Sequence, residues 1–143
     1  MMNEKILLPI FIGIILLTVG CGNTTSAGQY KLDKGRLVLD QEGTISEVYC
    51  KQRGLSNTIL VLESKYCHAC KEAVPKIKEA AKELGATVIY LDLAEKADQT
   101  RADNYGVLPY YTPTIIAGCK VYVGGKTKVE YTALIKSFLG KQK

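Results

Sequence analysis

The strongest structural signals in the chain come from the segment ILVLESKYCHACKEAVPKIKEAAKELG, residues 59–85. Its first residues, 59–62, are all apolar and rich in strand formers, which predicts a β-strand buried on both faces. Apolar residues then recur at helical spacing from Ala69 to Leu84, lysines and glutamates fill the other side, and Gly85 is a natural stop. The segment therefore predicts a buried strand, a short connection and a long amphipathic helix.

Two cysteines lie where this strand gives way to the helix, in the motif Cys67-His68-Ala69-Cys70. A helix N-terminus offers unpaired backbone N–H groups and the positive end of the helix dipole, so a thiolate at Cys67 is stabilised. Cys70 follows one turn later, at a separation that allows a disulfide. Cys67 is therefore expected to attack a substrate disulfide, and Cys70 to resolve the mixed disulfide that forms.

Weaker patterns predict the remaining elements. In chain order these are a strand at 37–39, a helix at 44–53, a strand at 87–93, a short polar helix before Tyr105, paired strands at 114–116 and 121–123, and a last helix that begins at the capping box of Thr127 and Glu130. The alternation of strands and helices predicts an α/β fold, with helices packed on both faces of a small mixed sheet.

The first residues have the pattern of a targeting segment. Lys5 is followed by an apolar run that is shorter than the ~20 residues of a membrane-spanning helix and ends in small residues before Cys21. This resembles the signal peptide of a prokaryotic lipoprotein, in which Cys21 becomes the lipidated first residue. Leu17 lies four residues before Cys21, whereas the usual pattern has leucine at the position of Thr18. An ordinary secretory signal and an uncleaved anchor are the alternatives.

The expected organisation is a signal peptide at 1–21, a polar tether at 22–29 and one domain at 30–143. The resemblance to lipoproteins implies export and a lipid anchor on the outer face of the cytoplasmic membrane, or on another extracytoplasmic membrane surface. The composition, 47% apolar and 23% charged, fits a compact domain. The net charge of +5 is scattered, and no basic run is interleaved with aromatic residues, which argues against nucleic-acid binding.

Two separated motifs resemble those of the thioredoxin family. Residues 66–75 look like its active-site segment, with Tyr66 before the first cysteine, Lys71 after the second and Pro75 inside the helix. Residues 105–107, followed by Thr112-Pro113, look like the segment that leads into the family's cis-proline. The resemblance covers about Thr58 to Leu139 and implies a thioredoxin-like fold.

The resemblance also implies how a substrate is held. A cis peptide bond before Pro113 would let the Thr112 backbone pair with an extended substrate beside the dithiol. Two extra residues within 108–111 are expected to enlarge the loop beside the active site. Tyr111 and its neighbour Tyr110 are then either contacts in a substrate groove or ordinary packing residues.

Several positions depart from the family pattern. Thioredoxins have a buried acid where Val61 stands, but Glu63 is expected on the same face of the strand. Glu63 is either a proton acceptor for Cys70 or a solvated residue at the strand end. His68 beside the nucleophile either stabilises the Cys67 thiolate when protonated or points into solvent.

Cys50 and Cys119 remain once Cys67 is paired with Cys70 and Cys21 is assigned to lipid. In the family fold their positions lie at the edge away from the active site, and an oxidising compartment permits a disulfide between them. Such a bond requires Cα atoms within ~7 Å, so the pairing stays open at the level of sequence.

The leading hypothesis is an extracytoplasmic thiol–disulfide oxidoreductase that acts on protein thiols and disulfides, most readily as a reductase recycled by a membrane-associated redox partner. No cofactor is implied. The alternative is a metal-binding or redox-sensing module without turnover. A metal site is disfavoured, because His68 is the only histidine and no second CxxC occurs. A purely structural Cys67–Cys70 disulfide would leave Pro113 unexplained.

Overall fold

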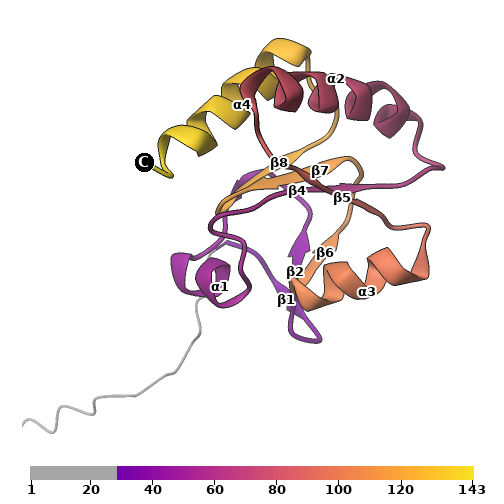
Figure 1. The fold of residues 1–143 in the computed structure, drawn as a ribbon. Coiled ribbons are helices and arrows are strands. Elements are labelled where there is room, and N and C mark those ends of the chain that lie inside the picture. The colour runs from indigo at the N-terminus through magenta and orange to yellow at the C-terminus, as the bar shows by residue number, and fades with distance from the viewer. Residues whose placement is uncertain (1–28) are drawn as a thin grey trace, which may run out of the picture.

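The computed structural model describes residues 29–143 (Figure 1); the predicted signal peptide, Cys21 and nearly all of the tether lie outside the described residues. The elements in chain order are β1 (Leu32–Asp33), β2 (Arg36–Leu39), β3 (Gly43–Thr44), α1 (Glu47–Gln52), β4 (Ile59–Glu63), α2 (His68–Leu84), β5 (Ile89–Asp92), α3 (Lys96–Asn104), β6 (Val107–Pro109), β7 (Thr114–Ala117), β8 (Lys120–Val123) and α4 (Lys128–Gly140). None of the helices in residues 29–143 combines the length and apolarity needed to span a membrane.

A mixed sheet of five strands forms the centre of the molecule, in the order β3-β8-β7-β4-β5. β4 pairs in parallel with β5 and antiparallel with β7, and the other pairs are antiparallel. β1, β2 and β6 form a second, smaller sheet, in which β2 and β6 are parallel. The predicted α/β class with a mixed sheet is confirmed.

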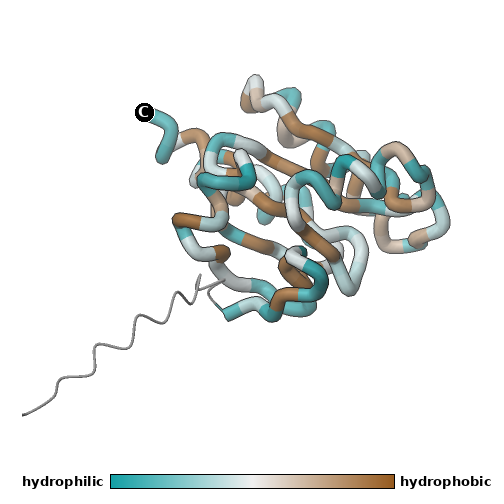
Figure 2. The backbone as a smooth tube through the Cα atoms, turned by 90° about the horizontal axis from the view of Figure 1, so that it is seen from below, coloured by the Kyte–Doolittle hydropathy of each residue, from teal (hydrophilic) through white to brown (hydrophobic). Residues whose placement is uncertain are grey.

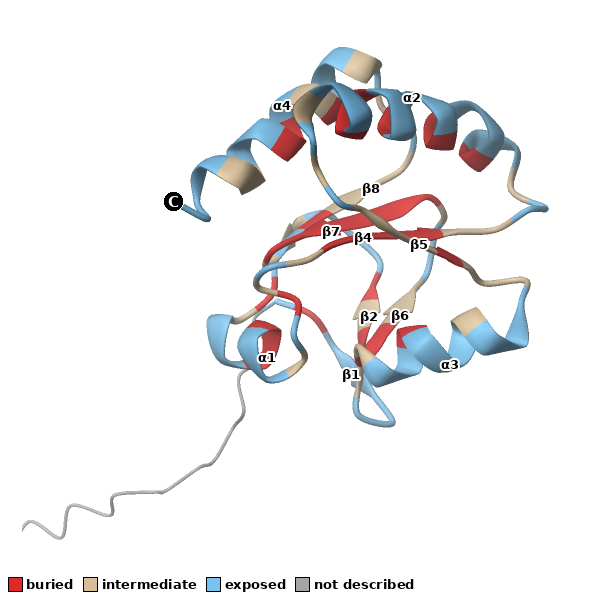
Figure 3. Cartoon of the chain, viewed as in Figure 1, coloured by how far each residue is buried: buried red, intermediate tan, exposed pale blue. Residues whose placement is uncertain are grey.

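Helices cover both faces of the central sheet, as the sequence predicts. α2 and α4 pack together over one face, and α1, α3 and the small sheet lie on the other (Figure 1). Buried residues concentrate along β4 and β7 and on the inner sides of α2 and α4 (Figure 3). Hydrophobic and hydrophilic residues alternate along the backbone, and the C-terminal end is hydrophilic (Figure 2). Two apolar clusters, one on each face, therefore hold the layers together.

The ends of α2 and α4 follow from local sequence. Cys67 is the N-cap of α2, and Gly85 ends the helix in the left-handed conformation with φ 63°, which glycine adopts without steric cost. α4 begins with a full capping box: the Thr127 hydroxyl accepts a hydrogen bond from the Glu130 N–H, and the Glu130 carboxylate accepts one from the Thr127 N–H.

Three boundaries differ from the sequence predictions. The helix expected at 44–53 begins only at Glu47, because Gly43–Thr44 pairs with β8 as the edge strand β3. The strand expected at 87–93 is limited to Ile89–Asp92. Part of the expected loop at 108–111 is instead β6, whose partner β2 lies about seventy residues earlier in the chain. These pairings depend on distant segments and leave no local periodicity to read.

Cys50 and Cys119 form a disulfide with Cα atoms 5.6 Å apart. Cys50 is fully buried in α1, and Cys119 lies in the tight turn between β7 and β8. The bond joins segments 69 residues apart and so fastens α1 to the hairpin. In the chain-entropy model, closing such a loop stabilises the fold by about 4 kcal/mol.

Replacement of both Cys50 and Cys119 by alanine is expected to lower the free energy of unfolding by about 4 kcal/mol, because the unfolded chain loses its long-range cross-link. Urea unfolding of the oxidised proteins measures this difference. The Cys67→Ala/Cys70→Ala variant is the control, since that bond closes a loop with a sequence separation of only 3 and contributes less loop entropy. Equal losses for the two double variants would contradict the argument.

Candidate redox site

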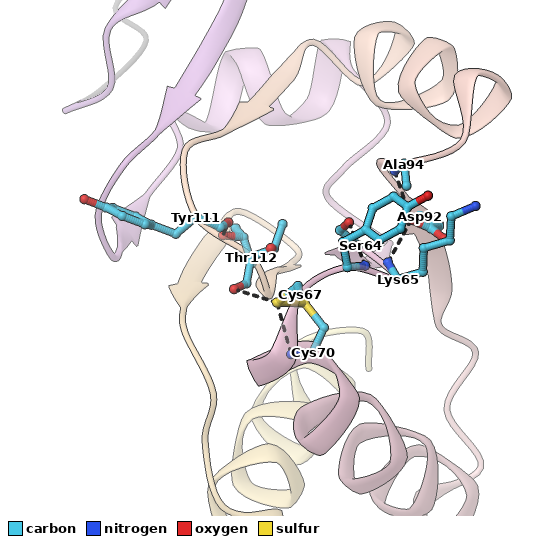
Figure 4. The surroundings of a disulfide bond; sticks show 10 residues. Ser64, Lys65, Cys67, Cys70, Asp92, Ala94, Tyr111 and Thr112 are labelled. Atoms are coloured by element: carbon cyan, nitrogen blue, oxygen red, sulfur yellow. Dashed lines mark hydrogen bonds between the residues drawn. A yellow bond between two sulfur atoms is a disulfide. The ribbon is translucent and has the colours of Figure 1, made fainter.

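The site is built on the N-terminus of α2. Cys67 is the N-cap, with extended backbone angles of φ −83° and ψ 115°, and its sulfur accepts a hydrogen bond from the Cys70 N–H at 3.1 Å. Cys67 and Cys70 form a disulfide, with Cα atoms 5.2 Å apart (Figure 4). A backbone N–H of the first helical turn, which has no partner within the helix, thus donates to the sulfur that the sequence predicts to be the nucleophile.

The two cysteines differ in exposure. Cys67 is partly exposed, whereas Cys70 is buried, with 1% of its surface accessible. Disulfide exchange needs access along the axis of the bond that breaks. A thiolate from another molecule would therefore meet Cys67, whereas Cys70 is shielded from solvent.

Thr112 and Pro113 face the disulfide from the other side of the site. Their peptide bond is cis, as the family resemblance implies. The Thr112 carbonyl oxygen lies 3.3 Å from the Cys67 sulfur, although the two residues are 45 positions apart in the chain (Figure 4). The loop is fixed by hydrogen bonds from the Thr114 hydroxyl to the Tyr111 carbonyl (2.7 Å) and from the Gly124 N–H to the Pro113 carbonyl (2.8 Å).

Exposed tyrosines lie in both loops of the site. Tyr66 directly precedes Cys67 and is 80% exposed, and Tyr110 and Tyr111 are 70% and 54% exposed. The rings of Tyr110 and Tyr111 meet edge to face with centroids 4.9 Å apart. Figure 4 shows Tyr111 directed away from the disulfide, on the outer side of its loop. The two rings therefore contact each other while both remain largely exposed.

His68 points into solvent. Its side chain is 91% exposed, and its Nε2 lies 3.6 Å from a carboxylate oxygen of Glu72, one turn along α2. The sequence left open whether His68 acts on the thiolate of Cys67 or is solvated, and this orientation corresponds to the solvated alternative.

Glu63 ends β4 on the face that α2 covers. Burial raises the pKa of its carboxyl, the Lys78 ammonium opposes that shift, and Asp92 and Asp98 add to it. No hydrogen bond contributes to the shift. Glu63 is half-buried, so the description of a freely solvated strand end does not fit it.

Two further residues of this region were not singled out from the sequence. Lys78 appeared only as one lysine among several on α2, and Tyr90 only as part of an expected strand. The Lys78 Nζ lies 5.2 Å from the centroid of the Tyr90 ring.

Asp92, at the end of β5, holds the loop before Cys67 in place. Its Oδ1 accepts hydrogen bonds from the N–H groups of Lys65 (3.1 Å) and Ala94 (2.9 Å).

Replacement of Glu63 by glutamine is expected to stabilise the protein at neutral pH and to have little effect below pH ~4, because the folded-state pKa of Glu63 lies above its unfolded value. Below both pKa values the Glu63 carboxyl is protonated in the folded and the unfolded state, so its ionisation does not change the free energy of unfolding. As pH rises from the unfolded pKa through the folded pKa, ionisation of Glu63 destabilises the native state, and glutamine avoids this cost. Urea unfolding of both proteins across this pH range tests the sign; a benefit that grows towards acid pH would contradict it.

The arrangement is compatible with a redox-active cysteine pair: a partly exposed sulfur lies at a helix N-terminus, and it is bonded to a buried sulfur of the same helix. No group of three or more His, Cys, Asp or Glu side chains within residues 29–143 is arranged to hold a metal ion. In comparisons with protein-family models and with curated proteins, the chain matches none of them.

Proposed function

We propose that the chain is an extracytoplasmic, lipid-anchored thiol–disulfide oxidoreductase of thioredoxin-like fold. The observation that carries the proposal is the partly exposed Cys67 at the start of α2, bonded to the buried Cys70 and faced by the cis Thr112–Pro113 peptide. A disulfide that served only to stabilise the fold would need neither the exposed sulfur nor the loop beside it.

The topology supports a thioredoxin-like fold. β4, α2 and β5 form a parallel strand–helix–strand unit, and β7 and β8 form an antiparallel hairpin that leads into α4. α2 and α4 share one face of the sheet, and α3 lies on the other. The departure is β2, which pairs with β6 in a separate small sheet rather than extending the central one.

The proposed reaction is the reduction of a protein disulfide. The Cys67 thiolate attacks one sulfur of the substrate disulfide, and the first substrate cysteine leaves as a thiolate that takes a proton from water. Cys70 then loses its proton and attacks the Cys67 sulfur. The second substrate cysteine leaves, and the Cys67–Cys70 disulfide forms. Two electrons pass to the substrate, and a membrane-associated thiol donor must return two electrons to the pair.

Tyr66, Tyr111 and the Thr112 backbone are proposed to hold the substrate polypeptide. The tyrosines offer apolar, exposed surface on both loops that flank Cys67. A lipid at Cys21 would keep the domain close to its membrane partner and raise the effective concentration of each for the other.

The reduction potential of the Cys67–Cys70 pair is expected near the reducing, thioredoxin-like value of about −270 mV. Equilibration in dithiothreitol buffers, followed by thiol alkylation and mass mapping, measures it. In the same samples the Cys50–Cys119 bond serves as an internal reference, because Cys50 is fully buried. A value near −120 mV would indicate that the pair oxidises its substrates instead of reducing them. If the Cys67–Cys70 pair did not titrate at all, the metal-binding or redox-sensing module would be favoured.

Lipid attachment is expected at Cys21. A Cys21→Ala variant should lose incorporation of labelled palmitate in a bacterial host, because no thiol then receives the diacylglyceryl group. The domain should also no longer sediment with membranes. Cys50→Ala serves as the matched cysteine control and should keep the label. Equal labelling of the Cys21→Ala and parent proteins would contradict the lipoprotein interpretation and favour a simple secretory signal or an uncleaved anchor.

A further inference from the structure

The cis-proline loop, residues 110–113, connects the two sheets. β6, which leads into this loop, belongs to the small sheet, and β7, which leaves it, belongs to the central sheet. Cys67 follows β4, a strand of the central sheet. The distance between Thr112 and the Cys67 sulfur therefore depends on how the small sheet is held against the central sheet.

α1 contacts both sheets through two consecutive residues. Cys50 is bonded to Cys119, in the turn that follows β7 of the central sheet. The hydroxyl of Tyr49 lies 2.7 Å from the Gly106 carbonyl oxygen, directly before β6, and 3.0 Å from the Gly35 carbonyl oxygen, directly before β2. α1 thus joins the starts of β2 and β6 in the small sheet to the turn after β7.

The contact between Tyr49 and Gly106 is close and buried. Tyr49 is 8% exposed, and the Gly106 carbonyl also accepts a hydrogen bond from the Leu37 N–H at 2.8 Å. A Cβ atom on residue 106 would lie 2.4 Å from the Tyr49 hydroxyl, and the φ of +68° at this position also favours glycine. Tyr49 therefore holds the beginning of β6 against the beginning of β2.

The pairing of β2 with β6 fixes the position of the cis-proline loop. Leu39 lies opposite Pro109 at the end of the pair, and the Tyr110 N–H then donates to the Leu39 carbonyl at 3.0 Å. Thr112 follows, and its carbonyl oxygen lies 3.3 Å from the Cys67 sulfur. A shift of the β2–β6 register by one residue would displace the loop by about 3.3 Å, which is enough to break that contact.

We infer that Tyr49 and the Cys50–Cys119 disulfide are positioning residues for the cis-proline loop, which they hold where a substrate polypeptide beside Cys67 can pair with it. The inference rests on the proposed thiol–disulfide exchange. The disulfide attaches α1 to the central sheet, and the Tyr49 hydroxyl attaches the small sheet to α1. Loss of either attachment weakens the binding of a polypeptide and leaves the reactivity of the Cys67 sulfur unchanged.

Two substrates separate the cis-proline loop from the sulfur chemistry. Insulin is a polypeptide disulfide that uses both the loop and Cys67, whereas Ellman's reagent is a small disulfide that uses only Cys67. The protein is prepared with the Cys67–Cys70 pair reduced and the Cys50–Cys119 bond intact, as established by thiol alkylation and mass mapping. The single-turnover rate of Cys67–Cys70 disulfide formation is then measured against the concentration of each substrate.

Tyr49→Phe removes only the hydroxyl. It should raise the half-saturating insulin concentration by about fivefold, the order expected for one net hydrogen bond, and leave the limiting rate and the reaction with Ellman's reagent unchanged. Cys50→Ala/Cys119→Ala should act in the same direction. In that double-alanine background, Tyr49→Phe should have a smaller further effect, because α1 has already lost its bond to the central sheet.

Tyr30→Phe is the matched control. Tyr30 is 4% exposed, and its hydroxyl also donates to a backbone carbonyl at 3.0 Å, but the acceptor is Gln41, outside the segment 106–119. This variant should react with insulin and with Ellman's reagent as the parent protein does. All variants are compared under conditions in which circular dichroism shows them to be folded. If the double-alanine variant does not fold, Tyr49→Phe carries the test.

Amide hydrogen exchange of the oxidised protein gives a readout that does not depend on activity. Tyr49→Phe should accelerate exchange of the Tyr110 N–H, which bonds to Leu39, because the β2–β6 pair is less firmly held. Exchange of the Ile116 N–H should stay unchanged, since β7 is paired with β4 on one side and with β8 on the other.

An unchanged half-saturating insulin concentration in Tyr49→Phe would overturn the inference. Equal losses with insulin and with Ellman's reagent would also overturn it, because they would assign the effect to Cys67 or to folding. If the parent protein reacts with neither substrate, the proposed function is contradicted instead, and exchange of the Tyr110 N–H still tests whether Tyr49 positions the loop.

Discussion

The structure depends on the burial of β4 in the middle of the central sheet. Residues 59–62 are at most 1% exposed, so both faces of β4 must be covered, and the helices and the small sheet provide that cover. The same strand fixes the site. α2 starts just beyond the carboxyl end of β4, and antiparallel pairing places Thr114 of β7 opposite Leu62. Pro113, which directly precedes Thr114, therefore lies at the same end of the central sheet as Cys67.

The two disulfides lie at opposite ends of the β4–β7 pair. Cys67 and Cys70 follow the carboxyl end of β4, whereas Cys119 follows Ala117, which pairs with Ile59 at the start of β4. The Cys50–Cys119 bond closes a long loop and includes a fully buried sulfur. The Cys67–Cys70 bond closes a short loop and leaves one sulfur within reach of solvent. Loop length and burial thus fit a stabilising cross-link at the first bond, and the exposed sulfur of the second is compatible with a redox-active pair.

The helix–sheet interface beneath the site contains polar groups that stability alone does not favour. The half-buried carboxyl of Glu63 and the buried hydroxyl of Tyr90, which has no hydrogen-bond partner among the described residues, lie on the face of the β4–β5 pair that α2 covers. Each costs free energy relative to an apolar side chain of similar size. Local departures of this kind are expected where a protein carries out chemistry, and both groups lie on the side of the sheet that faces the helix carrying the cysteines.

The amino-acid sequence by itself determined the elements whose signals are local: the apolar run of β4, the amphipathic pattern and glycine stop of α2, the capping box of α4 and the CxxC spacing at a helix start. The disulfide partner of Cys50, the strand that pairs with β2 and the position of Tyr90 opposite Val61 were decided only by the tertiary structure. Each of those contacts joins segments that are distant in the chain, and its formation depends on strand register and burial in three dimensions. Side-chain periodicity reports which face of an element is buried, but it does not report what lies against that face.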